Sequence, residues 1–132
     1  MEAAALGLGL DLVEIDRLEQ ALERRGERLL LRLFTDAERA YCGRRKRPGQ
    51  HFAARFAAKE AGFKALGTGW GDGVGWRDIE VINQSSGRPT LALHGRAAEV
   101  AAGRGWTVAE VSLTHAGNYA GATVLLMRAE IG

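Results

Sequence analysis

Leu6-Gly7-Leu8-Gly9-Leu10-Asp11-Leu12 alternates leucine with glycine or aspartate, residue by residue. Successive side chains of a β-strand point to opposite faces, so this pattern predicts a strand with its leucines on one face. The opposite face has almost no side chains before Asp11. A strand that is bare in this way lets a ligand lie against its backbone, next to a carboxylate that can bind a metal ion. We interpret Asp11 as a candidate ligand residue; the alternative is that it only caps the turn that follows.

A second carboxylate lies in the stretch Arg55-Phe56-Ala57-Ala58-Lys59-Glu60-Ala61. Its composition predicts a helix from about residue 50 to residue 66, ended by Gly67, whose alanines let it pack closely on a sheet. Lys64 follows Glu60 by one helical turn. This i,i+4 spacing is also that of an ordinary surface ion pair, which is the favoured interpretation of Glu60 and Lys64 taken alone.

Local signals predict the remaining elements. Asp16 is a candidate N-cap for a helix that turns Leu18 and Leu29 inward. Thr35-Asp36-Ala37-Glu38 has the form of a capping box, and Ser85-Ser86-Gly87 that of a hairpin turn. Further strands are expected over residues 79–83, 90–94, 106–114 and 119–127, and a short helix over residues 96–103. Together these elements predict an α+β fold in which an antiparallel sheet packs against helices.

Size and composition are those of one globular domain. The chain has 132 residues, 46% of them hydrophobic and 26% charged, and we expect a single domain over residues 1–132. No apolar stretch approaches the roughly 20 residues of a membrane-spanning helix, and the N-terminus does not resemble a signal peptide. The lone Cys42 cannot form an intrachain disulfide, which fits a cytoplasmic location, and we interpret it as a small buried side chain rather than a nucleophile.

Basic residues are concentrated in one segment. Residues 17–47 hold ten basic and five acidic side chains, whereas the whole chain has a net charge of only +2. On the predicted helix, Arg17, Arg24 and Arg28 line the outer side. Such a stripe indicates contact with an acidic partner. Charge alone does not distinguish a nucleic acid, a membrane surface and an acidic protein.

Two carboxylates far apart in sequence suit Mg²⁺, which seldom has a cage made only of protein and usually also binds substrate phosphates. Asp11 and Glu60 are therefore candidate metal ligands, and Lys64 would neutralise phosphate charge beside them. The glycine-rich segment 67–75 is not a P-loop, because it lacks the Gly-Lys-Ser/Thr ending and follows its helix. His115, predicted at a strand end, is free to contact a phosphate or to take a proton, unless it is simply a hydrogen-bonded surface residue.

Several segments, read as whole strings, resemble the bacterial holo-[acyl-carrier-protein] synthases, which are small phosphopantetheinyl transferases. The most specific match is Lys59-Glu60-Ala61 together with Lys64-Ala65-Leu66-Gly67-Thr68-Gly69, whereas Gly7-Leu8-Gly9-Leu10-Asp11 is less specific. The resemblance covers the chain from Leu6 to the last predicted strand, in the family's order. The other matching segments are residues 11–15, 34–42, 55–58, 83–89 and 112–115.

The resemblance implies the 4'-phosphopantetheinyl transferase fold and a Mg²⁺-dependent reaction. Coenzyme A donates its 4'-phosphopantetheine arm to a serine of apo acyl carrier protein, and adenosine 3',5'-bisphosphate is released. Asp11 and Glu60 match the family's metal ligands, and Glu60, Lys64 and His115 become candidate catalytic residues. The candidate coenzyme A-binding residues are Arg55, Lys64, Gly67, Thr68, Gly69 and His115.

Partners and assembly also follow from the resemblance. Arg17, Arg24 and Arg28 resemble the docking surface for the acidic helix of the carrier protein, in agreement with the charge stripe. Family members of this short type are generally homotrimers with active sites between subunits. Arg55 has the alternative role of a surface or interface ion pair. Ala116 departs from the family, in which a polar or acidic residue commonly follows the histidine, so no helper is assigned to His115 there.

Some alternatives stay open at this stage. The serine proton passes to Glu60, to a metal-bound water or to His115, and the carrier protein belongs to fatty acid or polyketide synthesis. The runner-up function is a noncatalytic nucleotide- or RNA-binding module. Such a module needs aromatic residues interleaved with its arginines, and only Phe34 and Tyr41 lie in the basic segment. The chain is also compatible with a domain of a larger synthase.

Overall fold

The computed structural model describes residues 5–68 and 72–129. Its base is a three-stranded antiparallel sheet, in which β5 (Tyr119–Met127) lies between β1 (Leu6–Glu14) and β4 (Val108–Ala116). A separate two-stranded sheet is formed by β2 (Ile79–Asn83) and β3 (Pro89–Leu93), and β3 contacts β4. The α+β class is confirmed, and the difference from expectation is that the strands form two sheets rather than one.

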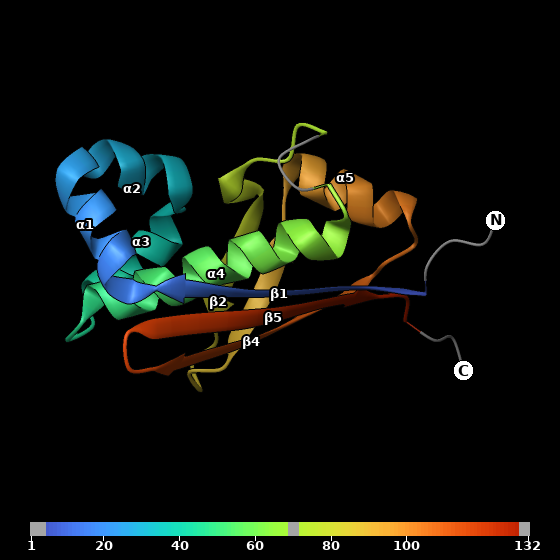
Figure 1. Cartoon of the computed structure of the whole chain (residues 1–132). Helices are drawn as coiled ribbons and strands as arrows, with labels where there is room; N and C mark the ends of the chain where they lie inside the picture. Colours follow the sequence, from blue (N-terminus) through green and yellow to red (C-terminus); the bar gives the residue numbers. More distant parts are fainter. Residues whose placement is uncertain (1–4, 69–71, 130–132) are drawn as a thin grey trace.

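Helix α4 (Pro48–Leu66) runs lengthwise over one face of the larger sheet (Figure 1). A Cβ added to Gly9 would lie 1.8 Å from Ala61 O, and one added to Gly7 would lie 2.2 Å from Ala65 O. The strand therefore needs glycine so that the helix backbone can lie directly on it. The prediction that a ligand lies against this bare face is wrong, because α4 already fills the space beside Gly7 and Gly9.

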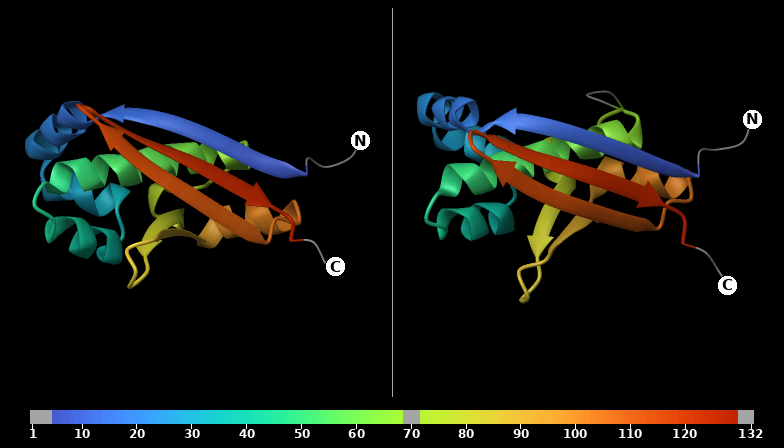
Figure 2. Two further views of the ribbon diagram at one scale, coloured as in Figure 1. Left: turned by 90° about the horizontal axis from the view of Figure 1, so that it is seen from below. Right: turned by 60° about the horizontal axis from the view of Figure 1, so that its bottom comes forward.

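The leucine face of β1 is the uncovered one. Figure 2 shows the larger sheet from the side away from α4, and no helix of residues 5–68 and 72–129 covers it. The exposed fraction of each β1 leucine lies between 46% and 66%, for Leu6, Leu8, Leu10 and Leu12. We name these four residues the leucine stripe. A row of exposed leucines on an open sheet is typical of an interaction surface.

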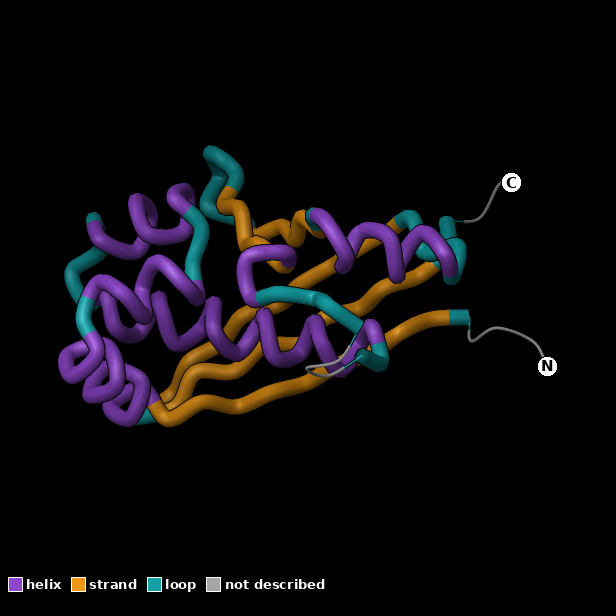
Figure 3. The backbone as a smooth tube through the Cα atoms, turned by 90° about the horizontal axis from the view of Figure 1, so that it is seen from above, coloured by secondary structure: helices purple, strands orange, loops and turns teal. Residues whose placement is uncertain are grey.

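Three helices gather where β1 ends (Figures 1 and 3). They are α1 (Ile15–Arg25), α2 (Glu27–Leu33) and α3 (Asp36–Gly43). The predicted helix past Asp16 is split at Gly26, whose φ of 67° lies in the left-handed region that favours glycine. Beyond α4, the short 3₁₀ helix η1 (Trp76–Asp78) leads into β2, and α5 (Gly95–Gly103) follows β3.

The prediction that Asp16 is the N-cap of α1 is wrong. Glu14 occupies the N-cap position, and Asp16 lies in the first turn of the helix. The Asp16 carboxylate accepts a hydrogen bond of 2.7 Å from Asn118 Nδ2, and the Asp16 amide donates one of 3.0 Å to Asn118 Oδ1. The helix thus starts against the turn between β4 and β5, and the aspartate serves that contact.

The predicted helix signals at Thr35 and Gly67 are confirmed. Thr35 and Glu38 form a reciprocal capping box at the start of α3. Gly67 ends α4 with a φ of 78°, in the left-handed region. Cys42 is fully buried, and this burial raises the pKa of its thiol to about 12, as expected of a side chain that is not a nucleophile. Within the described residues, no helix is long and apolar enough to cross a membrane.

Candidate functional site

Asp11 and Glu60 come together at one cavity, although they lie far apart in sequence. The cavity has a volume of about 770 Å³ and is lined by residues of β1, α1, α2 and α4, with Trp76 and Tyr119. Asp11 enters it from β1, beyond the point where the glycines bring α4 onto the strand, and Glu60 enters it from α4. Close packing of helix on strand is therefore what brings the two carboxylates to the same place.

The electrostatics of Glu60 show that the two carboxylates influence each other. Burial raises the pKa of Glu60 above its ordinary value, the negative charge of Asp11 raises it further, and Lys64 lowers it only in part. The negative charge of Asp11 thus acts on Glu60 more strongly than the positive charge of Lys64 does. Carboxylate oxygens are the donors that a hard divalent cation such as Mg²⁺ prefers. No group of three or more possible metal-binding residues occurs in the described ranges.

Lys64 pairs with Asp11 and not with Glu60. Its Nζ lies 2.9 Å from Asp11 Oδ1 and donates a second hydrogen bond of 3.1 Å to Leu10 O. The interpretation of Glu60 and Lys64 as an ordinary helical ion pair is therefore wrong. About half of the Lys64 side chain remains exposed, so its ammonium is accessible to a phosphate.

Apolar side chains form the other walls of this cavity. Phe56 and Trp76 stack with ring centroids 5.1 Å apart, and Phe63 meets Trp76 edge-on at 5.0 Å. Leucines and an alanine from α1 and α2 complete the apolar lining, at Leu18, Ala21, Leu29 and Leu33. Sequence reasoning missed Trp76, because it follows a loop and approaches α4 only in the folded chain.

The basic residues lie next to the carboxylates. Arg17 lines the same cavity as Asp11 and Glu60. Arg24 and Arg28 line an adjoining groove of about 550 Å³ between α1 and α2, together with Arg25, Leu29 and Arg32. Sequence reasoning missed Arg25 and Arg32, since the break at Gly26 changes which residues of α1 and α2 share a side. Arg25 and Arg32 line both the cavity and the groove, and therefore lie where the two meet.

His115 does not join the two carboxylates within one chain. It lies in β4, one residue before that strand ends, and its Nε2 is 3.1 Å from Gln50 Nε2. Gln50 precedes Glu60 by ten residues on α4. At about 1.5 Å of rise per residue, His115 therefore meets α4 roughly 15 Å from Glu60 along the helix axis.

Arg55 does not line the cavity that Asp11 and Glu60 share, and its surroundings are unusual for an arginine. It is only 2% exposed and donates hydrogen bonds to Asn83 Oδ1 at 2.5 Å and to His51 O at 3.0 Å. No carboxylate forms an ion pair with it within the described ranges, so the surface ion-pair interpretation is wrong, and its buried Nε has no hydrogen-bond partner. The guanidinium also lies 4.5 Å from the centroid of the Tyr41 ring.

Gly67 and Thr68 continue from the end of α4, one turn beyond Lys64. The guanidinium of Arg104 lies 3.4 Å from the position that a Gly67 Cβ would occupy, so a second cation borders this turn. Gly69, the third residue of the predicted nucleotide-binding segment, lies outside the described residues.

Comparisons with known proteins agree with this geometry. Residues 7–124 match the family described as the 4'-phosphopantetheinyl transferase superfamily. The chain is 49% identical over 121 residues to a holo-[acyl-carrier-protein] synthase of Koribacter versatilis, which covers 92% of this chain and 97% of that protein. The solved holo-[acyl-carrier-protein] synthase of Neisseria meningitidis superposes with a TM-score of 0.84 at 26% identity, covering 92% of this chain and 98% of that one. That of Bacillus anthracis, in complex with CoA (3',5'-ADP), superposes with a TM-score of 0.74 at 34% identity over 93% and 96% of the two chains.

Proposed function

This chain belongs to the 4'-phosphopantetheinyl transferase superfamily, and on that premise we propose how its residues act as a holo-[acyl-carrier-protein] synthase. The enzyme transfers the 4'-phosphopantetheine group of coenzyme A to a serine of apo acyl carrier protein and releases adenosine 3',5'-bisphosphate. The observation that carries the proposal is the meeting of Asp11 and Glu60 at one cavity, beside the Lys64 ammonium.

Asp11 and Glu60 are the residues that would hold Mg²⁺, because their oxygens are the donors that this ion prefers and their charge is only partly neutralised. When bound, the ion supplies positive charge to the diphosphate of coenzyme A. Lys64, half exposed and already directed at this site, donates to a phosphate oxygen as well. Lys64 thus binds and orients the diphosphate directly, and the acidic pair would do so only through the ion that it holds.

The transfer itself is a displacement at phosphorus. The serine oxygen forms a bond to the β-phosphorus, and the bond between that phosphorus and the bridging oxygen breaks, so that adenosine 3',5'-bisphosphate leaves with the electron pair. The serine proton passes to the carboxylate of Glu60 or to the imidazole of His115. Positioning and charge neutralisation supply most of the catalysis in such reactions.

The basic groove is the docking surface for the carrier protein. Arg17 lies in the cavity with the carboxylates, and Arg24 and Arg28 line the adjoining groove. An acidic helix lying in that groove would place its serine next to the cavity that holds Asp11 and Glu60. Charge complementarity of this kind mainly raises the rate of encounter. The fit of a carrier protein to this groove decides whether the partner belongs to fatty acid or to polyketide synthesis.

A homotrimer completes the site in this proposal. The leucine stripe is apolar and uncovered in one chain, and His115 meets α4 far from Glu60. Packing of sheets from neighbouring copies would bury the stripe and would bring His115 and Arg55 of one copy toward Asp11 of the next. Gly67, Thr68 and His115 would then border the nucleotide, in a cytoplasmic enzyme. Sedimentation analysis should give three chains per particle, and Leu10→Asp should give a monomer.

Mass spectrometry tests the reaction. An apo acyl carrier protein is incubated with the chain, coenzyme A and Mg²⁺, and its intact mass is measured. We expect a gain equal to one phosphopantetheine group, with adenosine 3',5'-bisphosphate formed in equal amount. A carrier protein of unchanged mass after long incubation with each acidic carrier protein tried would contradict the proposed function.

A further inference from the structure

Lys59 is next to Glu60 in the chain, but its side chain lies on a different side of α4. It is fully buried, and its Nζ lies 2.8 Å from Glu38 Oε1 and donates to Ile79 O at 2.6 Å and to Trp76 O at 3.0 Å. An ammonium group has three N–H donors, so the charge is completely surrounded by acceptors. Lys59 therefore cannot itself meet a substrate in the cavity.

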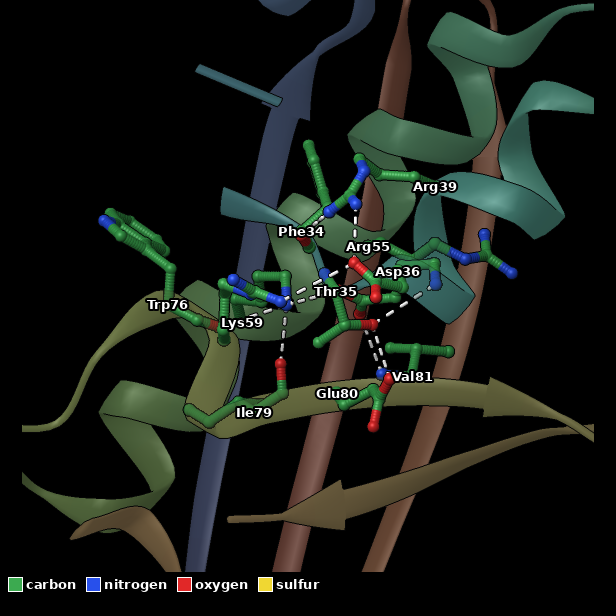
Figure 4. A network of polar contacts seen from close by, with 12 residues as sticks. Phe34, Thr35, Asp36, Arg39, Arg55, Lys59, Trp76, Ile79, Glu80 and Val81 are labelled. Atoms are coloured by element: carbon green, nitrogen blue, oxygen red, sulfur yellow. Dashed lines mark hydrogen bonds and ion pairs between the residues drawn. The ribbon is translucent and has the colours of Figure 1, made fainter. Parts of the chain in front are cut away.

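The partner of Lys59 is held just as firmly. Glu38 is also fully buried. Its Oε1 accepts from Thr35 N and its Oε2 accepts from Val81 N, each at 2.9 Å. Figure 4 shows Lys59 between α3 and the segment that enters β2, with Thr35 and Val81 close by. We name Lys59, Glu38 and the carbonyls of Trp76 and Ile79 the lysine clamp, since they join α3, α4, η1 and β2.

The lysine clamp reaches the cavity through Trp76. The Trp76 carbonyl accepts from Lys59, whereas the Trp76 ring stacks on Phe56 and lines the cavity that Glu60 also lines. Trp76 contacts α4 through Lys59 on its backbone side and through Phe56 and Phe63 on its ring side. Because the carbonyl and the ring belong to one residue, loss of the Lys59 hydrogen bond would let the backbone that carries the ring shift.

We propose that Lys59 is a positioning residue of the transferase: it holds the 76–79 segment on α4, so that Trp76 forms a fixed wall beside Glu60. The inference rests on the proposed function for its effect on turnover, but the clamp itself is independent of catalysis. A buried charge lowers the stability of a core unless it is fully paired. Here the paired charge of Lys59 specifies one arrangement of α3, α4, η1 and β2. Lys59 acts through Trp76 and does not touch the reacting atoms.

Hydrogen exchange tests the clamp without any substrate. Lys59→Met leaves the Glu38 carboxylate buried and unpaired, so the variant used is Glu38→Gln with Lys59→Met, which removes both charges. We expect exchange of the amides of residues 76–83 to become about tenfold faster or more, while β1 and β5 keep their protection. Should this variant not fold, Lys59→Arg, which keeps a cation beside Glu38 but changes its reach to the two carbonyls, carries the test with an expected change of roughly threefold. Glu99→Gln, which removes an exposed ion pair on α5, is the control and should leave residues 76–83 unchanged.

A double-mutant cycle tests the link to turnover. The Glu38→Gln, Lys59→Met variant should raise the KM for coenzyme A about tenfold when Trp76 is present, and less than about threefold in a Trp76→Ala background, because both changes remove the same wall. Equal effects in both backgrounds, or unchanged exchange over residues 76–83, would overturn the proposal. A chain that shows the exchange change but transfers no phosphopantetheine would contradict the proposed function and leave the clamp intact.

Discussion

The ammonium of Lys64 lies 2.9 Å from Asp11 Oδ1, so a lysine of α4 neutralises the aspartate of β1 when no substrate is present. The same lysine lowers the pKa of Glu60 only in part. In the substrate complex, Lys64 has two attractive partners, the Asp11 carboxylate and a phosphate of coenzyme A. The two roles make different predictions for its removal.

Lys64→Ala should change the affinities for Mg²⁺ and for coenzyme A in opposite directions. Without the lysine, Asp11 loses its competing cation, so Mg²⁺ alone should bind roughly two- to fivefold more tightly, as expected for a half-exposed ion pair worth at most about 1 kcal/mol. The KM for coenzyme A should rise roughly tenfold, because a charge-assisted hydrogen bond to phosphate is lost. Calorimetry and steady-state kinetics measure the two effects, and Lys64→Arg is the control. Weaker binding of Mg²⁺ alone would show that Lys64 does not compete for Asp11.

Gly9→Ala should destabilise the fold, although it adds only one methyl group. The new Cβ would lie 1.8 Å from Ala61 O, between two backbones that cannot move apart cheaply. We expect a loss of about 3 kcal/mol or more in the free energy of unfolding, at the upper end for overpacking. Gly43→Ala is the matched control: nothing lies within 4 Å of its added Cβ, so its stability should hold or rise slightly. Urea denaturation compares the two. Equal stabilities would mean that α4 does not rest on β1 in solution.

The raised pKa of Glu60 predicts a pH-dependent stability of the metal-free chain. The pKa of Glu60 is 4.5 in the unfolded chain and higher in the folded chain. As the pH rises above 4.5, Glu60 therefore stays protonated to a higher pH in the folded state than in the unfolded state. The folded state therefore binds more protons there, and the free energy of unfolding falls as the pH rises. The difference in Tm between the wild type and Glu60→Gln should shrink or reverse over this range, whereas Mg²⁺ should bind more tightly as the pH rises. A difference in Tm that does not depend on pH would contradict the raised pKa of Glu60.

Arg24→Glu should weaken docking of the carrier protein and leave coenzyme A unaffected. Arg24 lies in the basic groove and not in the cavity with Asp11 and Glu60. Reversal of a charge on such a surface should raise the KM for the carrier protein roughly tenfold at low salt and less at high salt. Arg128→Glu, at the far end of the sheet, is the control. An unchanged KM for the carrier protein would remove the groove from the docking surface.

Signals contained within a few residues predicted their structures well. The capping box of Thr35 and Glu38, the terminating Gly67 and the hairpin after Asn83 each depend on neighbours in sequence. The meeting of Asp11 and Glu60 also agrees with expectation, but that expectation came from whole motifs and not from spacing. Elements whose form is decided locally are therefore those that a single sequence predicts.

Contacts between distant segments explain the misjudged positions. The glycines of β1 are explained by α4, which lies more than fifty residues later in the chain. Asp16 accepts a hydrogen bond from Asn118, and Lys64 forms an ion pair with Asp11. The burial of Lys59 was not predicted, because a lysine in an alanine-rich helix usually faces solvent. Nothing in the residues next to Lys59 predicts its pairing with the buried Glu38. Such pairings depend on tertiary packing, which periodicity does not encode.

The most direct test of the central claim is calorimetric titration of Mg²⁺ into the chain with coenzyme A present, for the wild type, Glu60→Gln and Asp11→Asn. Glu99→Gln, an exposed acid on α5 that pairs with Arg96, is the control. We predict binding and phosphopantetheine transfer for the wild type and the control, and neither for the two site variants, all of them folded by circular dichroism. Binding of Mg²⁺ with wild-type affinity and full transfer by Glu60→Gln would contradict the account.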